Sequence, residues 1–465
     1  MRLLLAFGLA ALLLSGSATA QDWQSMSDEE RAAHFAQLQR EAEVDRQRMM
    51  ARLGVEVPSD LPPPADDPNR PAHLVPQEGS GNWTDATGNT HVRSEWGQWS
   101  NYVEAEAGDL APADPLVLRS GRRVETPAEW WALRRPQIVE DYLVELYGRV
   151  PAGAPSIVFE AVDADSVAGS AVVRRVVGRV DGVRQPEGAP RIEMTLYLPT
   201  EAAEPVPVVV RVGGFWGAEG TLPEPVRMAL DRGWAFATVA TGPIQMDSGA
   251  GLSKGVIGTV TGGRPREPED WGVLAAWAWG MSRALDYLDA APEVDASRAA
   301  IQGHSRWGKT ALLAGALDRR WTAVFASCSG AMGASLEKRN WGETIDNVAW
   351  AGEYHWMAGT FLKYAGNWDA MPGDAHFLIA PRPLFLAGGT EDQWADPHGT
   401  FLAAVAASPV YEFLGADGLD AVERPPPDVA LTDGELAFRN HDGGHTDAPD
   451  WPVFYDWIAP YFAAE

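Results

Sequence analysis

Residues 303–310 read GHSRWGKT, an octapeptide that fits two motifs with different chemistry. Its spacing matches G-x-x-x-x-G-K-[ST], the loop that holds nucleotide phosphates, and it also resembles a serine nucleophile on a tight strand-to-helix turn. A phosphate loop works best with small interior residues, whereas the interior here is His-Ser-Arg-Trp. It also requires a later strand that ends in a magnesium-binding Asp, but the next apolar run, TAVFASCSG, ends in Ser, Cys and Gly. The nucleotide interpretation is therefore disfavoured.

An esterase interpretation requires a strand, a turn with the serine at its apex, and a helix whose first N–H groups stabilise an oxyanion. Residues 299–302 (AAIQ) supply the strand, Gly303 allows the turn to close, and residues 309–314 (KTALLA) supply the helix. The second glycine is Gly308, whereas the usual G-x-S-x-G motif would have it at Trp307. Ser305 is the predicted nucleophile.

The acid and base of a Ser-acid-His triad are expected later in the chain, in that order. His445 follows two glycines just before the last predicted helix and is the predicted base, whereas His441 has only its proximity in its favour. Asp392 follows the apolar run RPLFLAGGT and is the predicted acid. Glu391 and Asp396 are its rivals, and a helix cap is the other interpretation of Asp392.

The elements that must position these residues are short, β-branched runs separated by helical patterns. The predicted strands are 206–214, 234–241, 298–305, 322–330 and 382–390. Continuous apolar strands that alternate with helices indicate an α/β protein with a mostly parallel sheet buried on both faces by helices. Functional residues in such folds lie beyond the carboxyl ends of the strands, and every residue singled out above does so.

The N-terminal region predicts export. Residues 1–20 contain a single Arg, an apolar run and a small-residue end, which is the pattern of a signal peptide cleaved after Ala20 and is too short for a membrane span. A capping box that begins at Ser27 predicts a polar helix to about Gly54, followed by a Pro- and Asp-rich linker. We therefore assign 1–20 to the signal, 21–80 to the helix and linker, and 81–465 to the catalytic domain.

The amino-acid composition limits the classes of molecule that the protein is expected to bind. The chain has 37 basic and 64 acidic residues, a net charge of −27, which disfavours nucleic acid as a partner. The single cysteine, Cys328, excludes an internal disulfide, so a large core must stabilise the fold. The 20 tryptophans outnumber the other aromatic types and mildly favour a protein that stacks on sugar rings.

At this point the sequence resembles the glucuronoyl esterases of carbohydrate esterase family 15, which have the α/β-hydrolase fold. The nucleophile motif of that family is G-C-S-R-x-G-K, and residues 303–309 read GHSRWGK. Further similar segments lie between about residues 100 and 460: NYVEAEAG, RRPQIVEDYLVELYGRVP, NWGETI, EYHWMAGTFLKYAGN, LIAPRPLFL, EDQWADP and GGHTDAPDW.

The resemblance implies hydrolysis of the ester that joins 4-O-methyl-glucuronic acid of xylan to lignin alcohols. It implies that Arg306 stabilises the oxyanion beside Ser305 and His445, and that Lys309, Glu343 and Trp394 bind the sugar. A second oxyanion donor is expected from the backbone of residues 213–215. The expected substrate is glucuronoxylan in lignin-carbohydrate esters. The protein is expected to be a monomer that requires no metal or cofactor and binds neither nucleic acid nor membrane.

Two departures from the family and several alternatives accompany this interpretation. Fungal members carry a disulfide-forming Cys where this chain has His304, and their triad acid is a Glu whose matching place holds Cys328 or Ser329. Another serine esterase of acetyl or feruloyl type and a sugar-binding protein with an inactive triad remain alternatives. So do a surface role for Lys309, a capping role for Glu343 and a packing role for Trp394.

Overall fold

The computed structural model describes residues 26–463, apart from residues 56–74, 77–82, 85–87, 89, 95–97, 109–111, 163–165, 169–170, 183–187, 216–221 and 373–375. The predicted signal peptide and most of the predicted linker lie outside the described residues. The chain contains two compact units. The first unit contains the chain up to Leu53, Leu146–Ile301 and Ala351–Thr360, and the second contains Gly54–Glu145, Gln302–Trp350 and Phe361–Glu465.

The first unit is built on strands in the order β11-β9-β10-β8-β7-β5, with β6 paired to β7. The strands are β5 (Ile157–Ala161), β6 (Ser166–Ala168), β7 (Ala171–Val180), β8 (Arg191–Pro199), β9 (Val206–Val212), β10 (Ala235–Ala240) and β11 (Val294–His304). The predicted strands β9 and β10 are present and parallel, and every residue of β9 is buried. Strands β5 to β8, which were not predicted, pair antiparallel with one another, and β8 with β10.

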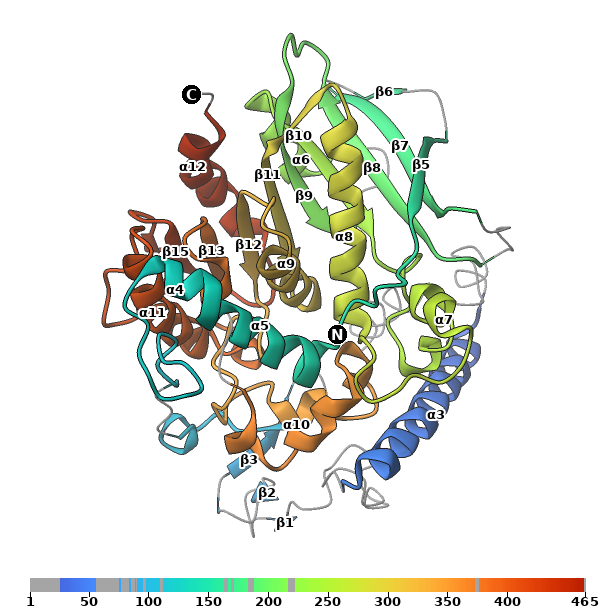
Figure 1. Cartoon of the computed structure of the whole chain (residues 1–465), viewed down its shortest axis with the longest axis vertical. Helices are drawn as coiled ribbons and strands as arrows, with labels where there is room; N and C mark the ends of the chain where they lie inside the picture. The colour runs from blue at the N-terminus through green and yellow to red at the C-terminus, as the bar shows by residue number, and fades with distance from the viewer. Residues whose placement is uncertain are drawn as a thin grey trace. The chain divides into compact units, whose positions relative to one another are not determined.

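The helices of the first unit are α3 (Asp28–Leu53), α6 (Glu224–Asp231), α7 (Gly255–Thr261) and α8 (Val273–Ala290). Helix α6 packs on β8 and β10, and α8 contacts β8 (Figure 1). None of the helices within the described ranges is long and apolar enough to cross a membrane.

Helix α3 begins where the capping box predicted it, because the Ser27 hydroxyl accepts the N–H of Glu30 at 3.2 Å while Glu30 Oε2 accepts the N–H of Ser27 at 2.7 Å. The helix has a buried stripe in spite of its polar composition, since Ala42 and Met49 are among its buried residues. A Cβ atom at Gly249 would lie 2.7 Å from Ala42 Cβ, so α3 packs closely on that glycine turn. The amphipathic pattern was too weak for the sequence to indicate this contact.

The second unit contains β12 to β15 in the order β14-β15-β13-β12, followed by the end of β11. Its strands are β1 (Val75–Pro76), β2 (Trp83–Thr84), β3 (Thr90–Arg93), β4 (Trp99–Ser100), β12 (Ala323–Ser327), β13 (Leu384–Gly389), β14 (Ala430–Leu431) and β15 (Leu436–His441). Strands β1 to β4 form a small antiparallel sheet. Strands β12, β13 and β15 are parallel, with Leu384 aligned with both Val324 and Leu436. These strands therefore bring their carboxyl ends to one edge.

The helices of the second unit are α4 (Pro127–Glu129), α5 (Arg135–Tyr142), α9 (Arg306–Leu317), α10 (Ile345–Val348), α11 (Pro397–Phe413) and α12 (Trp451–Phe462). Helix α9 packs directly on β12, and α11 on β13 and β15 (Figure 1). The Phe454 ring of α12 stacks on Phe325 of β12 with 4.8 Å between centroids. This aromatic packing holds α12, the helix that follows the loop carrying His445, against β12.

Candidate active site

Ser305 occupies the turn between β11 and α9, as the sequence predicted. Its φ and ψ are 59° and −132°, a conformation that a non-glycine residue adopts only under constraint and that is found mostly at functional sites. The constraint is provided by hydrogen bonds: the Ser305 N–H donates to Ser327 O at 2.8 Å, and its carbonyl accepts the N–H of Gly308, also at 2.8 Å. The serine is thus held in a strained turn between strand and helix.

The two glycines of the motif are required by close backbone approaches. A Cβ at Gly303 would lie 1.9 Å from Trp307 O. A Cβ at Gly308 would lie 2.9 Å from Ser329 Cβ and 3.1 Å from Ser327 O, because the first turn of α9 runs against the end of β12. The displaced glycine therefore stands at the position that faces the neighbouring strand.

His445 and Asp392 form a close pair. His445 Nδ1 lies 2.7 Å from Asp392 Oδ2, with the carboxylate buried and the imidazole partly exposed. Burial raises the pKa of Asp392, but the hydrogen bond and charge of His445 outweigh it, so the pKa of this carboxyl lies below its usual value. A carboxylate that accepts the Nδ1 proton leaves Nε2 as the nitrogen able to act as a base.

The rivals of Asp392 have other surroundings. Glu391 is exposed. Asp396 is the helix-capping carboxylate, because its Oδ1 accepts the N–H of Gly399 at 2.8 Å at the start of α11. Its Oδ2 accepts from Arg339 Nε at 2.8 Å, and burial raises its pKa to about 6. Asp392 makes no side-chain cap, so the capping interpretation applies to Asp396.

The loops after β13 and β15 are tied together by their backbones. The N–H of Thr390 donates to His441 O at 2.9 Å, and that of Glu391 donates to Gly443 O at 2.8 Å. A Cβ at Gly389 would lie 2.2 Å from Gly444 O, so only glycine permits this approach. The pairing of these two loops is what brings Asp392 to His445.

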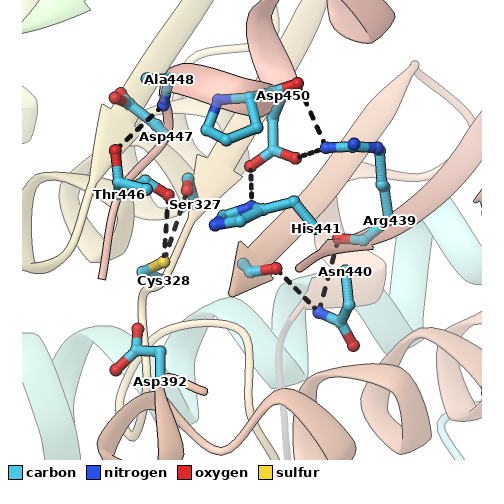
Figure 2. Close-up of polar contacts among 12 residues, drawn as sticks. Ser327, Cys328, Asp392, Arg439, Asn440, His441, Thr446, Asp447, Ala448 and Asp450 are labelled. Carbon is cyan, nitrogen blue, oxygen red and sulfur yellow. Dashed lines mark hydrogen bonds and ion pairs between the residues drawn. The ribbon is translucent and has the colours of Figure 1, made fainter. Parts of the chain in front are cut away.

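His441, the other histidine of the loop, is buried at the end of β15 (Figure 2). Its Nδ1 lies 3.0 Å from Asp450 Oδ2 and its Nε2 lies 3.3 Å from Gly444 O, so both nitrogens face acceptors. Burial lowers the pKa of His441, but the hydrogen bond and charge of Asp450 outweigh it and the net shift is upward. Asp450 in turn accepts from Arg439. His441 therefore holds the loop that precedes His445, and the sequence offered only its proximity as a signal.

Lys309 and Glu343 form a buried ion pair. Lys309 Nζ lies 2.5 Å from Glu343 Oε2 and 2.7 Å from Ser329 O, and it also donates to Ala331 O. An ammonium has three N–H groups, so these acceptors take all of them. Lys309 is thus not a surface lysine. Glu343 is not a cap either, because the side chain of Thr344 caps α10.

Trp394 lies beside this pair. The N–H of Glu343 donates to Trp394 O at 2.8 Å, and Trp394 is buried. Gly330 has a φ of 56°, and a Cβ there would lie 2.5 Å from Glu343 Oε2, so the loop after β12 approaches the pair closely. The structure therefore brings together the three residues predicted to bind sugar.

Of the groups predicted to stabilise the oxyanion, the structure locates Arg306 beside Ser305, whereas no backbone donor from residues 213–215 is identified. Arg306 is the first residue of α9 and is partly exposed. In the first unit, the N–H of Gly213 donates to Val239 O at 2.8 Å and so is already engaged. The Phe215 ring lies 4.7 Å from the guanidinium carbon of Arg211. A donor from Gly214 or Phe215 stays a prediction.

A serine on a strained strand-to-helix turn, with a carboxylate-histidine pair at the ends of neighbouring parallel strands, defines a serine hydrolase of the α/β-hydrolase class. A family model described as glucuronyl esterase, fungi, matches residues 183–415. Carbohydrate esterase MZ0003 of an unknown prokaryotic organism is 32% identical over 397 residues, which cover 77% of this chain and 91% of that protein.

Further similarity comes from a fungal enzyme and a solved bacterial structure. A 4-O-methyl-glucuronoyl methylesterase of Schizophyllum commune is 29% identical over 65% of this chain and 73% of that protein. The structure of a CE15 glucuronoyl esterase from Teredinibacter turnerae matches with a TM-score of 0.76 and 35% identity, covering 91% of this chain and all of that one. The chain belongs to the glucuronoyl esterases of carbohydrate esterase family 15, and the predicted α/β-hydrolase fold is confirmed.

Proposed function

We propose that this protein hydrolyses the ester between 4-O-methyl-glucuronic acid of xylan and lignin alcohols, with Ser305, His445 and Asp392 as its catalytic triad. The observation that carries the proposal is the 2.7 Å pair of His445 and Asp392 at the same strand edge as the strained Ser305. Membership of the family adds the glucuronoyl substrate, because the fungal relative carries the name 4-O-methyl-glucuronoyl methylesterase.

In the proposed reaction, Ser305 Oγ attacks the C6 carbonyl of the glucuronate while His445 Nε2 takes the hydroxyl proton. Asp392 accepts a hydrogen bond from Nδ1–H and its negative charge stabilises the imidazolium that forms. The oxyanion is stabilised by the N-terminus of α9 and by Arg306. The alcohol leaves with the proton from His445, and water then hydrolyses the glucuronoyl enzyme by the same base.

We propose further that the Lys309-Glu343 pair and Trp394 bind the glucuronoyl sugar. Since the three donors of Lys309 are engaged, its contribution is to fix and charge-balance the Glu343 carboxylate, which can accept hydrogen bonds from sugar hydroxyls. The Trp394 ring would supply the apolar face for the sugar, since the Trp394 backbone lies beside Glu343, whose N–H donates to Trp394 O. Rigid placement of these groups fixes one orientation of the sugar. The site therefore favours glucuronate esters over the neutral acyl esters that other esterases hydrolyse.

The test is turnover of benzyl glucuronate compared with turnover of an aryl acetate. A higher kcat/KM for the glucuronate ester supports the proposal, whereas equal or better turnover of the acetate indicates the alternative, an esterase of another type. Ser305→Ala should reduce activity to the residual catalysis of the oxyanion site, about 10³ to 10⁴ above water. Sugar binding without turnover in the unaltered protein would indicate a binding protein.

We infer from the N-terminal pattern that the protein is exported after removal of residues 1–20. Expression of the full chain followed by mass measurement of the mature protein tests this inference, because cleavage after Ala20 predicts Gln21 as the new N-terminus. Sedimentation analysis of the mature protein tests the expected monomer.

A further inference from the structure

Three potential metal ligands lie close together at the proposed catalytic base. One of them is the base His445, and the other two, His304 and Cys328, belong neither to the triad nor to the proposed sugar site. A ring nitrogen of His304, the Sγ of Cys328 and a ring nitrogen of His445 all lie within 4.8 Å of one another. The two imidazoles are neighbours, with 4.5 Å between ring centroids and an interplanar angle of 56°. His304 is the last residue of β11, Cys328 directly follows β12, and His445 lies in the loop after β15.

The chemistry and geometry of this cluster suit a soft divalent cation. Thiolate and imidazole are the ligands preferred by Zn²⁺, which binds them at about 2.0 to 2.3 Å and keeps a position open for water in sites with three protein ligands. Such bond lengths in a tetrahedral site place the ligand atoms roughly 3.5 Å apart. Because the three ligand atoms already lie within 4.8 Å of one another, approaches of at most about 1.3 Å, made by the two partly exposed histidines, are enough to form the site.

The three side chains of the cluster differ in their exposure to solvent. His304 and His445 are partly exposed, whereas Cys328 is buried beneath them. Cys328 Sγ lies 3.6 Å from Thr446 O and 3.7 Å from Ser327 Oγ (Figure 2). His304 Nδ1 lies 3.4 Å from the same hydroxyl. An ion can thus meet an imidazole first and reach the thiol afterwards.

We propose that His304, Cys328 and His445 form a binding site for a thiophilic divalent cation such as Zn²⁺, and that occupation of this site reversibly switches the esterase off. The inhibitory part rests on the proposed role of His445 as the base. An ion on Nε2 takes the lone pair that would accept the Ser305 proton. An ion on Nδ1 replaces the proton that Asp392 accepts at 2.7 Å. Either mode removes the base.

The proton balance of binding is determined by Cys328. A thiol coordinates a metal ion as its thiolate, so binding at Cys328 releases one proton to solvent. The positive charge of the ion offsets the cost of forming the buried thiolate, as it does in structural zinc sites. The Asp392 charge, which opposes an isolated thiolate, favours the bound cation.

The cluster includes the two positions at which the sequence departs from the fungal pattern. The fungal pattern has Cys at the position of His304 and Glu near the position of Cys328, so the ligand set arises from the two departures noted from the sequence.

The experiment uses the metal-free mature protein and measures Zn²⁺ binding by equilibrium dialysis in parallel with turnover of benzyl glucuronate. We expect one Zn²⁺ per chain, loss of turnover upon binding, and full recovery with EDTA. Co²⁺ provides a readout that does not depend on turnover, because a cobalt-thiolate bond produces a charge-transfer absorption band. Cys328→Ala and His304→Gln should keep metal-free turnover while raising the half-inhibitory Zn²⁺ concentration by at least about tenfold, since even outer partners of metal ligands contribute that much.

His34→Gln, on α3 of the first unit, is the matched control for loss of an imidazole elsewhere and should leave the Zn²⁺ sensitivity unchanged. Cys328→Ser replaces Cys328→Ala if the latter does not melt like wild type. A thiol-free variant with wild-type sensitivity to Zn²⁺, or wild type that neither binds Zn²⁺ nor forms the cobalt band, overturns the site. A cobalt band in a protein without glucuronate esterase activity keeps the site and rejects the proposed function.

Discussion

Exchange of Asp392 for Asn is the sharpest test of the triad. The carboxylate accepts the Nδ1 proton of His445 at 2.7 Å and is buried, so an amide of the same shape would occupy the same place. Loss of a charge-assisted hydrogen bond accounts for about 1.5 to 3 kcal/mol. An amide N–H facing Nδ1 also favours the tautomer with its proton on Nε2, which cannot act as the base. Together these effects predict a fall in kcat of up to about 10⁴, or roughly 5.4 kcal/mol.

The assay is kcat for benzyl glucuronate at saturating substrate, with each variant first shown to have a wild-type melting transition. Glu391→Gln is the matched control, because Glu391 is adjacent in sequence but exposed. Its kcat should stay within a few-fold of wild type. Cys328→Glu added to Asp392→Asn should restore part of the rate, since Cys328 contacts Asp392 and the family supplies its acid near that place. An Asp392→Asn enzyme within a few-fold of wild type would refute the assignment.

Three further predictions concern stability and specificity. Lys309→Met leaves Glu343 buried without its cation and should lower the free energy of unfolding, measured in urea, by about 3 to 5 kcal/mol; a loss below about 1 kcal/mol contradicts a buried pair. Glu343→Gln should cost about 1 to 3 kcal/mol of transition-state stabilisation for glucuronate esters and less for aryl acetates, and equal losses for both substrates would reject a sugar-binding role. His441 has a folded-state pKa above the ordinary 6.5, so the stability it contributes is fully present below pH 6.5 and is lost as pH rises through the folded value. The difference in unfolding free energy between wild type and His441→Gln should therefore shrink as pH rises above 6.5, and a difference that grows would show that the histidine is neutral when folded.

The sequence by itself determined the local features of this protein. The turn at Ser305, the helix that begins after Ser27 and the apolar strands β9 to β13 all depend on residues adjacent in the chain, whose backbone preferences and periodicity are readable without a partner. The motif at residues 303–309 and the later order of acid and histidine indicated a serine esterase, and the resemblance of further segments between about residues 100 and 460 indicated its family. The antiparallel strands β5 to β8 carried no comparable signal, because their half-buried pattern depends on pairing partners elsewhere in the chain.

Only the tertiary structure decided which of several nearby candidates meet. Asp392, Glu391 and Asp396 lie within one short segment, and the backbone pairing of the loops after β13 and β15 decides that Asp392 faces His445. The Lys309-Glu343 pair joins residues 34 positions apart, and the approach of His304 to Cys328 depends on the register of neighbouring strands. A shift of one residue in a strand or loop turns a side chain to the opposite face, so such contacts are determined by packing over long sequence separations and not by the residues that flank them.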